Sequence, residues 1–154
     1  MTFHEFVVDK FKLPNVYKAH KLSQTAYFGL IDGDFKQFEL LSKEAYELSP
    51  TSYKVFIIYA LRSYFFDTYI NKKSVYRQWY QTKPDLLIAR WGLAEILISR
   101  NDYASALSLF DPGSIRKGSL ESIIFNKVNA RESIQMNQEF LNEFHSHFNH
   151  IYLQ

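Results

Sequence analysis

The stretch LAEILISRNDYASALSLF, residues 93–110, decides the fold, because it predicts one helix, a tight turn and the start of a second helix. Its turn, Asn101-Asp102-Tyr103, repeats the pattern of Gly33-Asp34-Phe35. Pro50 and Pro84 each follow another helix-like stretch, and proline, which lacks an amide donor, ends helices. The two prolines lie half as far apart as the two turns. Two unrelated markers therefore share one period, which predicts stacked helix pairs.

A period of about 34 residues fits both markers and is a length typical of helical repeats. It divides residues 19–120 into three segments, 19–52, 53–86 and 87–120. The eighth position of each segment is a small residue: Ala26, Ala60 and Ala94. The third segment adds Ala106 near the start of its second helix and Phe110 one turn later. The middle segment departs most from this pattern, with Asp67-Thr68-Tyr69 in place of the glycine turn and Trp79 at a position of close packing.

These features resemble the tetratricopeptide repeat (TPR) family, whose repeats have the same length. The resemblance covers residues 19–120, which is about two-thirds of the chain. It implies an all-α fold, a right-handed superhelix of antiparallel helix pairs, with no catalytic centre of its own. A looser array of helical hairpins is the structural alternative.

Both flanks of the repeats predict capping helices, which a repeat array needs to cover its terminal faces. Residues 1–18 carry an apolar stripe before Pro14, made of Phe3, Phe6, Val7 and Phe11. After Gly118, Ser119 is a predicted helix N-cap, and residues 119–154 predict one or two helices with a break near Asn137. We therefore expect one helical-repeat domain over residues 1–154.

In the TPR family the first helix of each pair lines the concave side, and the resemblance implies which residues face a ligand there. We expect ten of them to form a binding groove: Tyr27, Leu30, Lys54, Ile57, Leu61, Tyr64, Phe65, Trp91, Glu95 and Ile98. A wall this rich in apolar and aromatic side chains suits an apolar peptide or an amphipathic helix. The alternative is that a flanking helix of the chain itself folds into the groove and buries these residues.

We therefore expect an adaptor or chaperone that binds another protein. The small size and short helical flanks resemble the class II chaperones of bacterial type III secretion, which hold apolar segments of their partners in a similar groove. The alternative is a structural subunit that joins a larger assembly, or a homodimer, through its flanking helices.

Composition argues against several other classes of function. The 18 basic and 16 acidic residues leave a net charge of +2, which does not favour a polyanion binder. Lys72-Lys73 beside Tyr69 and Tyr76 is a weaker hypothesis for nucleic-acid binding. The chain has no cysteine, no clustered glycine loop for phosphate and no serine nucleophile motif. We therefore expect no enzyme activity and no cofactor.

Three side chains near the C-terminus have the spacing of metal ligands on a helix: Glu143, His147 and His150. No second element supplies a further ligand, so we interpret them as a solvent-facing helix surface and expect no metal.

Hydropathy predicts a cytoplasmic protein. The longest uninterrupted apolar run, from Val55 to Leu61, is seven residues, whereas a membrane-spanning helix needs about 20. Residues 1–14 contain no apolar run typical of a signal peptide.

Overall fold

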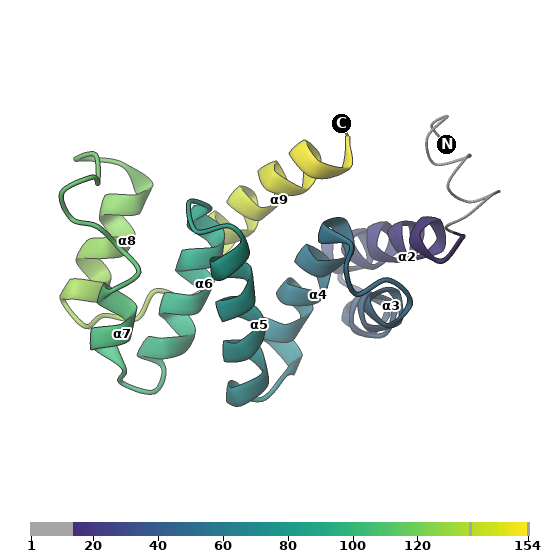
Figure 1. Ribbon diagram of the computed structural model, residues 1–154, viewed down its shortest axis with the longest axis horizontal. Helices are drawn as coiled ribbons and strands as arrows, with labels where there is room; N and C mark the ends of the chain where they lie inside the picture. The colour runs from purple at the N-terminus through teal and green to yellow at the C-terminus, as the bar shows by residue number, and fades with distance from the viewer. Residues whose placement is uncertain (1–13, 136, 154) are drawn as a thin grey trace. The chain divides into compact units, whose positions relative to one another are not determined.

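The computed structural model describes residues 14–135 and 137–153, and within these residues every regular element is a helix (Figure 1). The all-α prediction is therefore confirmed for the described chain. The helix predicted within residues 1–13 lies outside the described residues. The helices are α2 (Pro14–Ile31), α3 (Phe35–Leu48), α4 (Tyr53–Phe66), α5 (Tyr69–Thr82), α6 (Leu87–Ile98), α7 (Tyr103–Leu107), α8 (Leu120–Asn129) and α9 (Gln138–Tyr152).

The starts of α3 to α7 follow the period found in the sequence, whereas α2 begins at Pro14, before the predicted start of the first repeat at residue 19. Helices α3, α5 and α7 begin at Phe35, Tyr69 and Tyr103, each one full period after the one before. Helices α4 and α6 begin at Tyr53 and Leu87, which are again one period apart. The first and third predicted helix pairs are present, because α2 contacts α3 and α6 contacts α7. The middle predicted pair, α4 and α5, is divided between two compact units, and a superhelix of the TPR kind stays a prediction.

The two predicted turns have the left-handed backbone that their residues favour. Gly33 has φ = 86° and Asn101 has φ = 62°; glycine has no Cβ to clash there, and asparagine tolerates this conformation better than most residues. The aspartate that follows each of them caps the next helix. The Asp34 side chain accepts a hydrogen bond from the backbone N–H of Gln37, and Asp102 accepts one from Ser105.

The middle repeat makes its turn differently. Asp67 occupies the position of Gly33 and Asn101, but its φ is −88°. Its carboxylate accepts hydrogen bonds from the Arg62 guanidinium (3.0 Å) and the Ser63 hydroxyl (2.8 Å). Arg62 also lies over the Tyr59 ring, 5.4 Å from its centroid. An ion pair at the end of α4 therefore replaces the left-handed turn.

The chain divides into two compact units, residues 1–67 (unit 1) and 68–154 (unit 2). The single domain expected over residues 1–154 stays a prediction beside this division. In unit 1, helices α2, α3 and α4 all contact one another. Fully buried Ala19, Ala45 and Val55 form a cluster at their crossing, and the rings of Tyr46 and Tyr59 stack at 3.9 Å.

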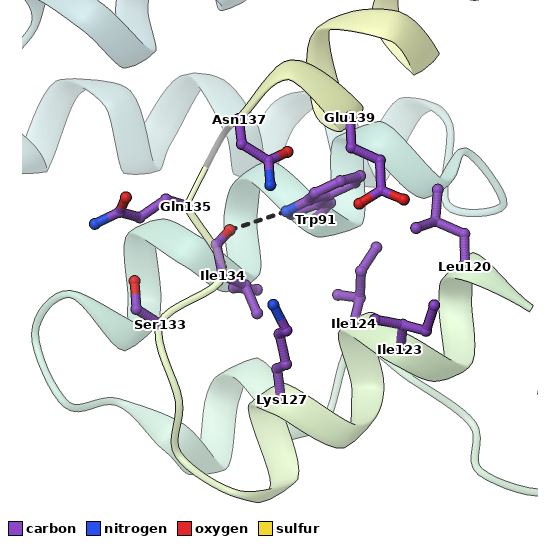
Figure 2. A pocket seen from close by; sticks show the side chains of 10 residues that line it. All are labelled: Trp91, Leu120, Ile123, Ile124, Lys127, Ser133, Ile134, Gln135, Asn137 and Glu139. Carbon is purple, nitrogen blue, oxygen red and sulfur yellow. Dashed lines mark hydrogen bonds between the residues drawn. The ribbon is translucent and has the colours of Figure 1, made fainter.

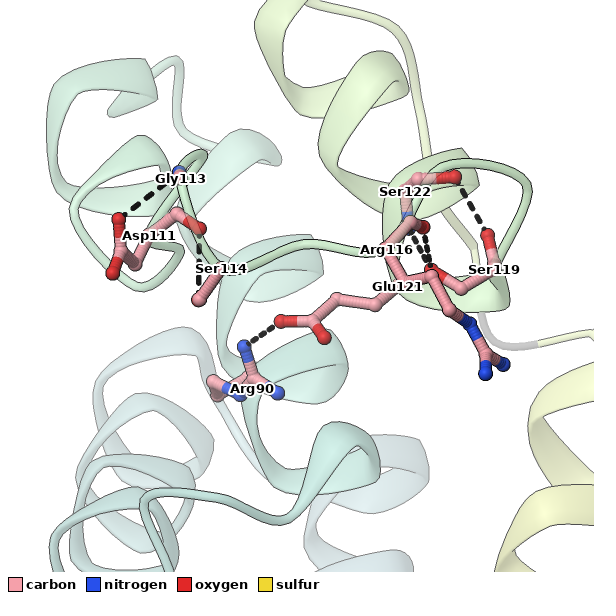
Figure 3. Close-up of polar contacts among 8 residues, drawn as sticks. All are labelled: Arg90, Asp111, Gly113, Ser114, Arg116, Ser119, Glu121 and Ser122. Carbon is pink, nitrogen blue, oxygen red and sulfur yellow. Dashed lines mark hydrogen bonds and ion pairs between the residues drawn. The ribbon is translucent and has the colours of Figure 1, made fainter.

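In unit 2, α6 lies between its neighbours and contacts α5, α7, α8 and α9 (Figure 1). Arg90 of α6 pairs with Glu121 of α8 and lies over the Phe110 ring, which ties the two helices together (Figure 3). Helix α7 is short and ends at Leu107.

The helix start predicted at Ser119 is confirmed, and the structure has two helices in this part of the chain. The Ser119 hydroxyl caps α8 by accepting a hydrogen bond from the backbone N–H of Ser122 (Figure 3). The Asn137 side chain caps α9 in the same way, accepting from Phe140. Between them, α8 ends at Asn129, and residues 130–137 connect the two helices.

Replacing Asp34 by alanine should lower the free energy of unfolding by about 1 kcal/mol, because the first turn of α3 loses its side-chain acceptor. Urea denaturation followed by circular dichroism measures the change. Asp32→Ala is the matched control, since Asp32 is exposed in the same turn and caps no helix. Equal losses in the two variants would contradict the capping role.

Candidate functional site

The ten predicted groove residues lie on α2 and α4 of unit 1 and on α6 of unit 2. Seven belong to unit 1: Tyr27, Ile57 and Leu61 are buried, Leu30, Lys54 and Tyr64 are half-buried, and Phe65 is exposed. Three belong to unit 2: Trp91 and Ile98 are buried and Glu95 is half-buried. Half of the predicted groove is thus packed inside the free chain, and its role in binding stays a prediction.

The C-terminal part of the chain covers Trp91. The indole Nε1 donates a hydrogen bond to the carbonyl oxygen of Ile134 (2.9 Å). The indole ring meets the Phe140 ring edge to face, with 5.2 Å between centroids. At Trp91 the structure therefore shows the second arrangement considered above, in which a flanking segment covers the first helix of a pair.

Helix α9 packs on α5 and α6 through one aromatic stripe. Phe140, Phe144 and Phe148 recur every four residues, so they share one helix face, and each is at most 2% exposed. Phe144 meets Trp79 of α5 edge to face at 6.3 Å. The outward face is polar and includes Asn142, Glu143, His145 and Ser146. Unit 2 thus holds an amphipathic helix against two tryptophans.

A pocket of about 370 Å³ lies beside this contact, between α8, Trp91, residues 133–135 and Asn137 (Figure 2). Ile124 and Ile134 are buried in its wall, and Ile123 is 48% exposed at its mouth. Lys127 of α8 and Glu139 of α9 contribute opposite charges. The sequence patterns missed this pocket, because Ile134 lies in a non-helical connection where no period marks it as buried.

Unit 1 exposes large apolar side chains near the ends of its helices. They are Phe28 and Ile31 on α2, Phe35 and Leu40 on α3, and Phe65 and Phe66 on α4. The centroid of the exposed Phe66 ring lies 6.3 Å from that of the buried Phe38 ring, so Phe66 connects this exposed group to the core of unit 1.

Histidines on α9 lie near the start of α6, where His147 and His150 line a shallow depression with Glu143 and Leu87. Burial lowers the pKa of His147 below its ordinary value of 6.5, and the nearby His150 and Lys83 lower it further. Within residues 14–135 and 137–153, no group of three histidine, cysteine or acidic side chains is placed to hold a metal ion. No helix in the described part of the chain is long and apolar enough to cross a membrane.

Comparisons with known proteins give no match: no family model, no curated protein and no solved structure is similar to this chain.

Replacing Phe144 by alanine should lower the free energy of unfolding by about 3–5 kcal/mol, because a fully buried ring is lost beside Trp79. It should also release α9, so that limited proteolysis cuts within residues 130–137. Asn142→Ala on the outward face is the control and should change stability by about 0.5 kcal/mol or less. Equal protease resistance in both variants would show that α9 does not depend on the phenylalanine stripe.

Acidification should weaken the packing of α9 through His147. A lowered pKa means that the folded state favours the neutral imidazole, so this contribution to stability is complete above pH 6.5 and is lost as the pH falls below 6.5 toward the lowered pKa. Urea denaturation between pH 7.5 and pH 5 measures the effect. His147→Gln should lose less stability on acidification than the parent, and equal losses in the two would contradict this role of His147.

Proposed function

We propose that this chain is a protein-binding scaffold, an adaptor or chaperone, whose α5–α6 surface holds an amphipathic helix with an aromatic stripe. One observation carries the proposal: the surface already holds such a helix, the chain's own α9, through three buried phenylalanines. Amphipathic helices are commonly recognised in this way, with apolar side chains at helical spacing entering an apolar groove.

The chemistry of the surface suits a protein partner. Trp79 and Trp91 supply large, rigid apolar walls, and tryptophan is a frequent anchor of binding energy at protein interfaces. The Trp91 indole N–H is satisfied by the Ile134 carbonyl, so it is not left unpaired in an apolar contact. The periodic helix pairs and the resemblance to the TPR family support the same class of function.

Helix α9 occupies the surface as a tethered ligand. Residues 130–137 join it to α8, and a tether this short gives an effective concentration in the millimolar range. A partner helix must therefore displace α9 or find it already released. Exchange of α9 between two copies is the second candidate, in which the chain forms a homodimer through its C-terminal helix.

A labelled peptide of residues 137–153 tests this surface. It should bind the full-length Phe144→Ala, Phe148→Ala variant saturably, and at least about tenfold more tightly than it binds the parent chain, whose own α9 competes. A peptide with both phenylalanines replaced by alanine is the control and should not bind. Equal binding of both peptides would overturn the proposal.

Light scattering on the parent chain separates the two candidates. A monomer mass that stays constant with concentration favours exchange with a different partner. A dimer that dissociates when Phe144 and Phe148 are replaced favours exchange between copies. A dimer that persists in that variant would place the self-association elsewhere and remove α9 from this role.

A further inference from the structure

Unit 2 has a second place, besides the α5–α6 surface, that could hold part of a partner protein. We infer that the pocket between α8, Trp91, residues 133–135 and Asn137 binds a peptide segment of another protein, with one aliphatic side chain against Ile123 and Ile124 and charged residues on both sides of it. This site uses different residues from the phenylalanine stripe, and it is formed while α9 is in place.

The size and lining of the pocket fit an aliphatic side chain. Its volume of about 370 Å³ is near the lower end of the range for ligand sites and exceeds that of one leucine or isoleucine side chain. Ile124, Ile134 and Trp91 form a buried apolar wall, between 2% and 4% exposed. These residues keep the pocket in shape because they are packed before any ligand enters.

The mouth of the pocket indicates that the occupant continues beyond it. Ile123 is 48% exposed on the outer side of α8, so a small molecule inside the pocket would leave it uncovered. A peptide that runs across the mouth would cover Ile123 and keep its own ends in water. An exposed aliphatic side chain beside a preformed pocket is where interface contacts gain most from excluding water.

The connection between α8 and α9 offers backbone groups to such a peptide. The carbonyl of Ile134 is taken by Trp91, but the backbone of Ser133 and Gln135 forms no hydrogen bond within the described residues. In Figure 2 the side chains of Ser133 and Gln135 point away from the pocket, while that of Ile134 points toward it. Unpaired backbone groups beside a pocket with one apolar wall are what peptide-binding sites use for affinity.

Two opposite charges set the chemistry on either side of the aliphatic residue. Figure 2 shows the Lys127 side chain and the Glu139 side chain reaching into the pocket from different elements, α8 and α9. Lys127 lies near the C-terminal end of α8, where its backbone carbonyl oxygen accepts a hydrogen bond from the backbone N–H of Glu132. Glu139 lies at the other end, just after Asn137. A complementary peptide therefore carries an acidic residue toward Lys127 and a basic residue toward Glu139.

Fluorescence anisotropy with two labelled peptides tests the inference on the full-length chain. Each has a central leucine with a glutamate two residues to one side and a lysine two residues to the other, in opposite orders. We expect saturable binding of one order, and a loss of about tenfold or more for the same peptide with aspartate in place of leucine. Failure of both orders to saturate at millimolar concentration would overturn the inference.

Variants of the protein locate the binding. Ile123→Asp should weaken it about tenfold or more, while Leu40→Asp, another exposed aliphatic residue, on α3 of unit 1, should leave it unchanged. The double change Lys127→Glu, Glu139→Lys should reverse the preferred peptide order. Circular dichroism checks the helix content of each variant. If Ile123→Asp loses helix, Lys127→Glu alone replaces it and should weaken binding of the preferred peptide. Full binding by the Ile123→Asp chain, or an unchanged order preference in the double variant, would overturn the site.

A competition arm keeps this result separate from the α9 proposal. An unlabelled peptide of residues 137–153 should not displace the leucine peptide, because it competes with α9 for the α5–α6 surface and not for Ile123 and Ile124, although Trp91 borders both sites. Displacement would show that both peptides bind the α5–α6 surface and would overturn the second site. Saturable leucine-peptide binding with no binding of the α9 peptide to the Phe144→Ala, Phe148→Ala variant would support this pocket and overturn the proposed function.

Discussion

An apolar helix must be covered on every side, and this constraint governs both units. Helix α4 is buried from Val55 to Ser63 except at Tyr59, and α6 is buried from Ile88 to Ile98 except at Arg90 and Glu95. Neither helix has a face that water could wet without cost. The other helices are amphipathic by comparison and bury one face each. In unit 2 the cover for α6 comes from four different helices, and α9 is the last of them along the chain.

Small residues make this covering possible. Ala26, Ala60 and Ala94 stand at the eighth position of the three repeats, and each is fully buried. A larger side chain would hold the neighbouring helix away and leave a gap that water cannot fill well. The markers at Gly33, Asn101, Pro50 and Pro84 predicted the starts of α3 to α7, whereas α2 begins at Pro14, outside the period.

The site was less predictable than the fold, for a physical reason. Turns, caps and proline stops are local, so Asp34, Ser119 and Asn137 reveal their roles within a few residues of sequence. The cover over Trp91 is not local, because its hydrogen-bond partner Ile134 lies 43 residues away. Position in the repeat predicted that Trp91 faces a groove, and α9 and Ile134 lie against it. No helical period in the sequence predicts that Ile134 is buried. The roles of Lys127 and Glu139 depend on the pocket that both side chains line, which the sequence alone does not reveal.

The strength with which α9 is held decides whether unit 2 can exchange it. Burying a phenylalanine side chain contributes about 1.5–3 kcal/mol, as an upper estimate from area. Together, three buried phenylalanines on one helix face contribute more than roughly 4 kcal/mol, which is the free-energy difference between binding at a millimolar effective concentration and binding at the 1 M standard state. A partner with the same stripe would therefore compete on nearly equal terms only when it is concentrated or when α9 is loosened. The half-buried His147 supplies one means of loosening, because its protonation adds charge near His150 and Lys83. Helix α9 completes the core of unit 2 through one face, Phe140, Phe144 and Phe148, and this single face is what a partner helix would have to match under the proposed function.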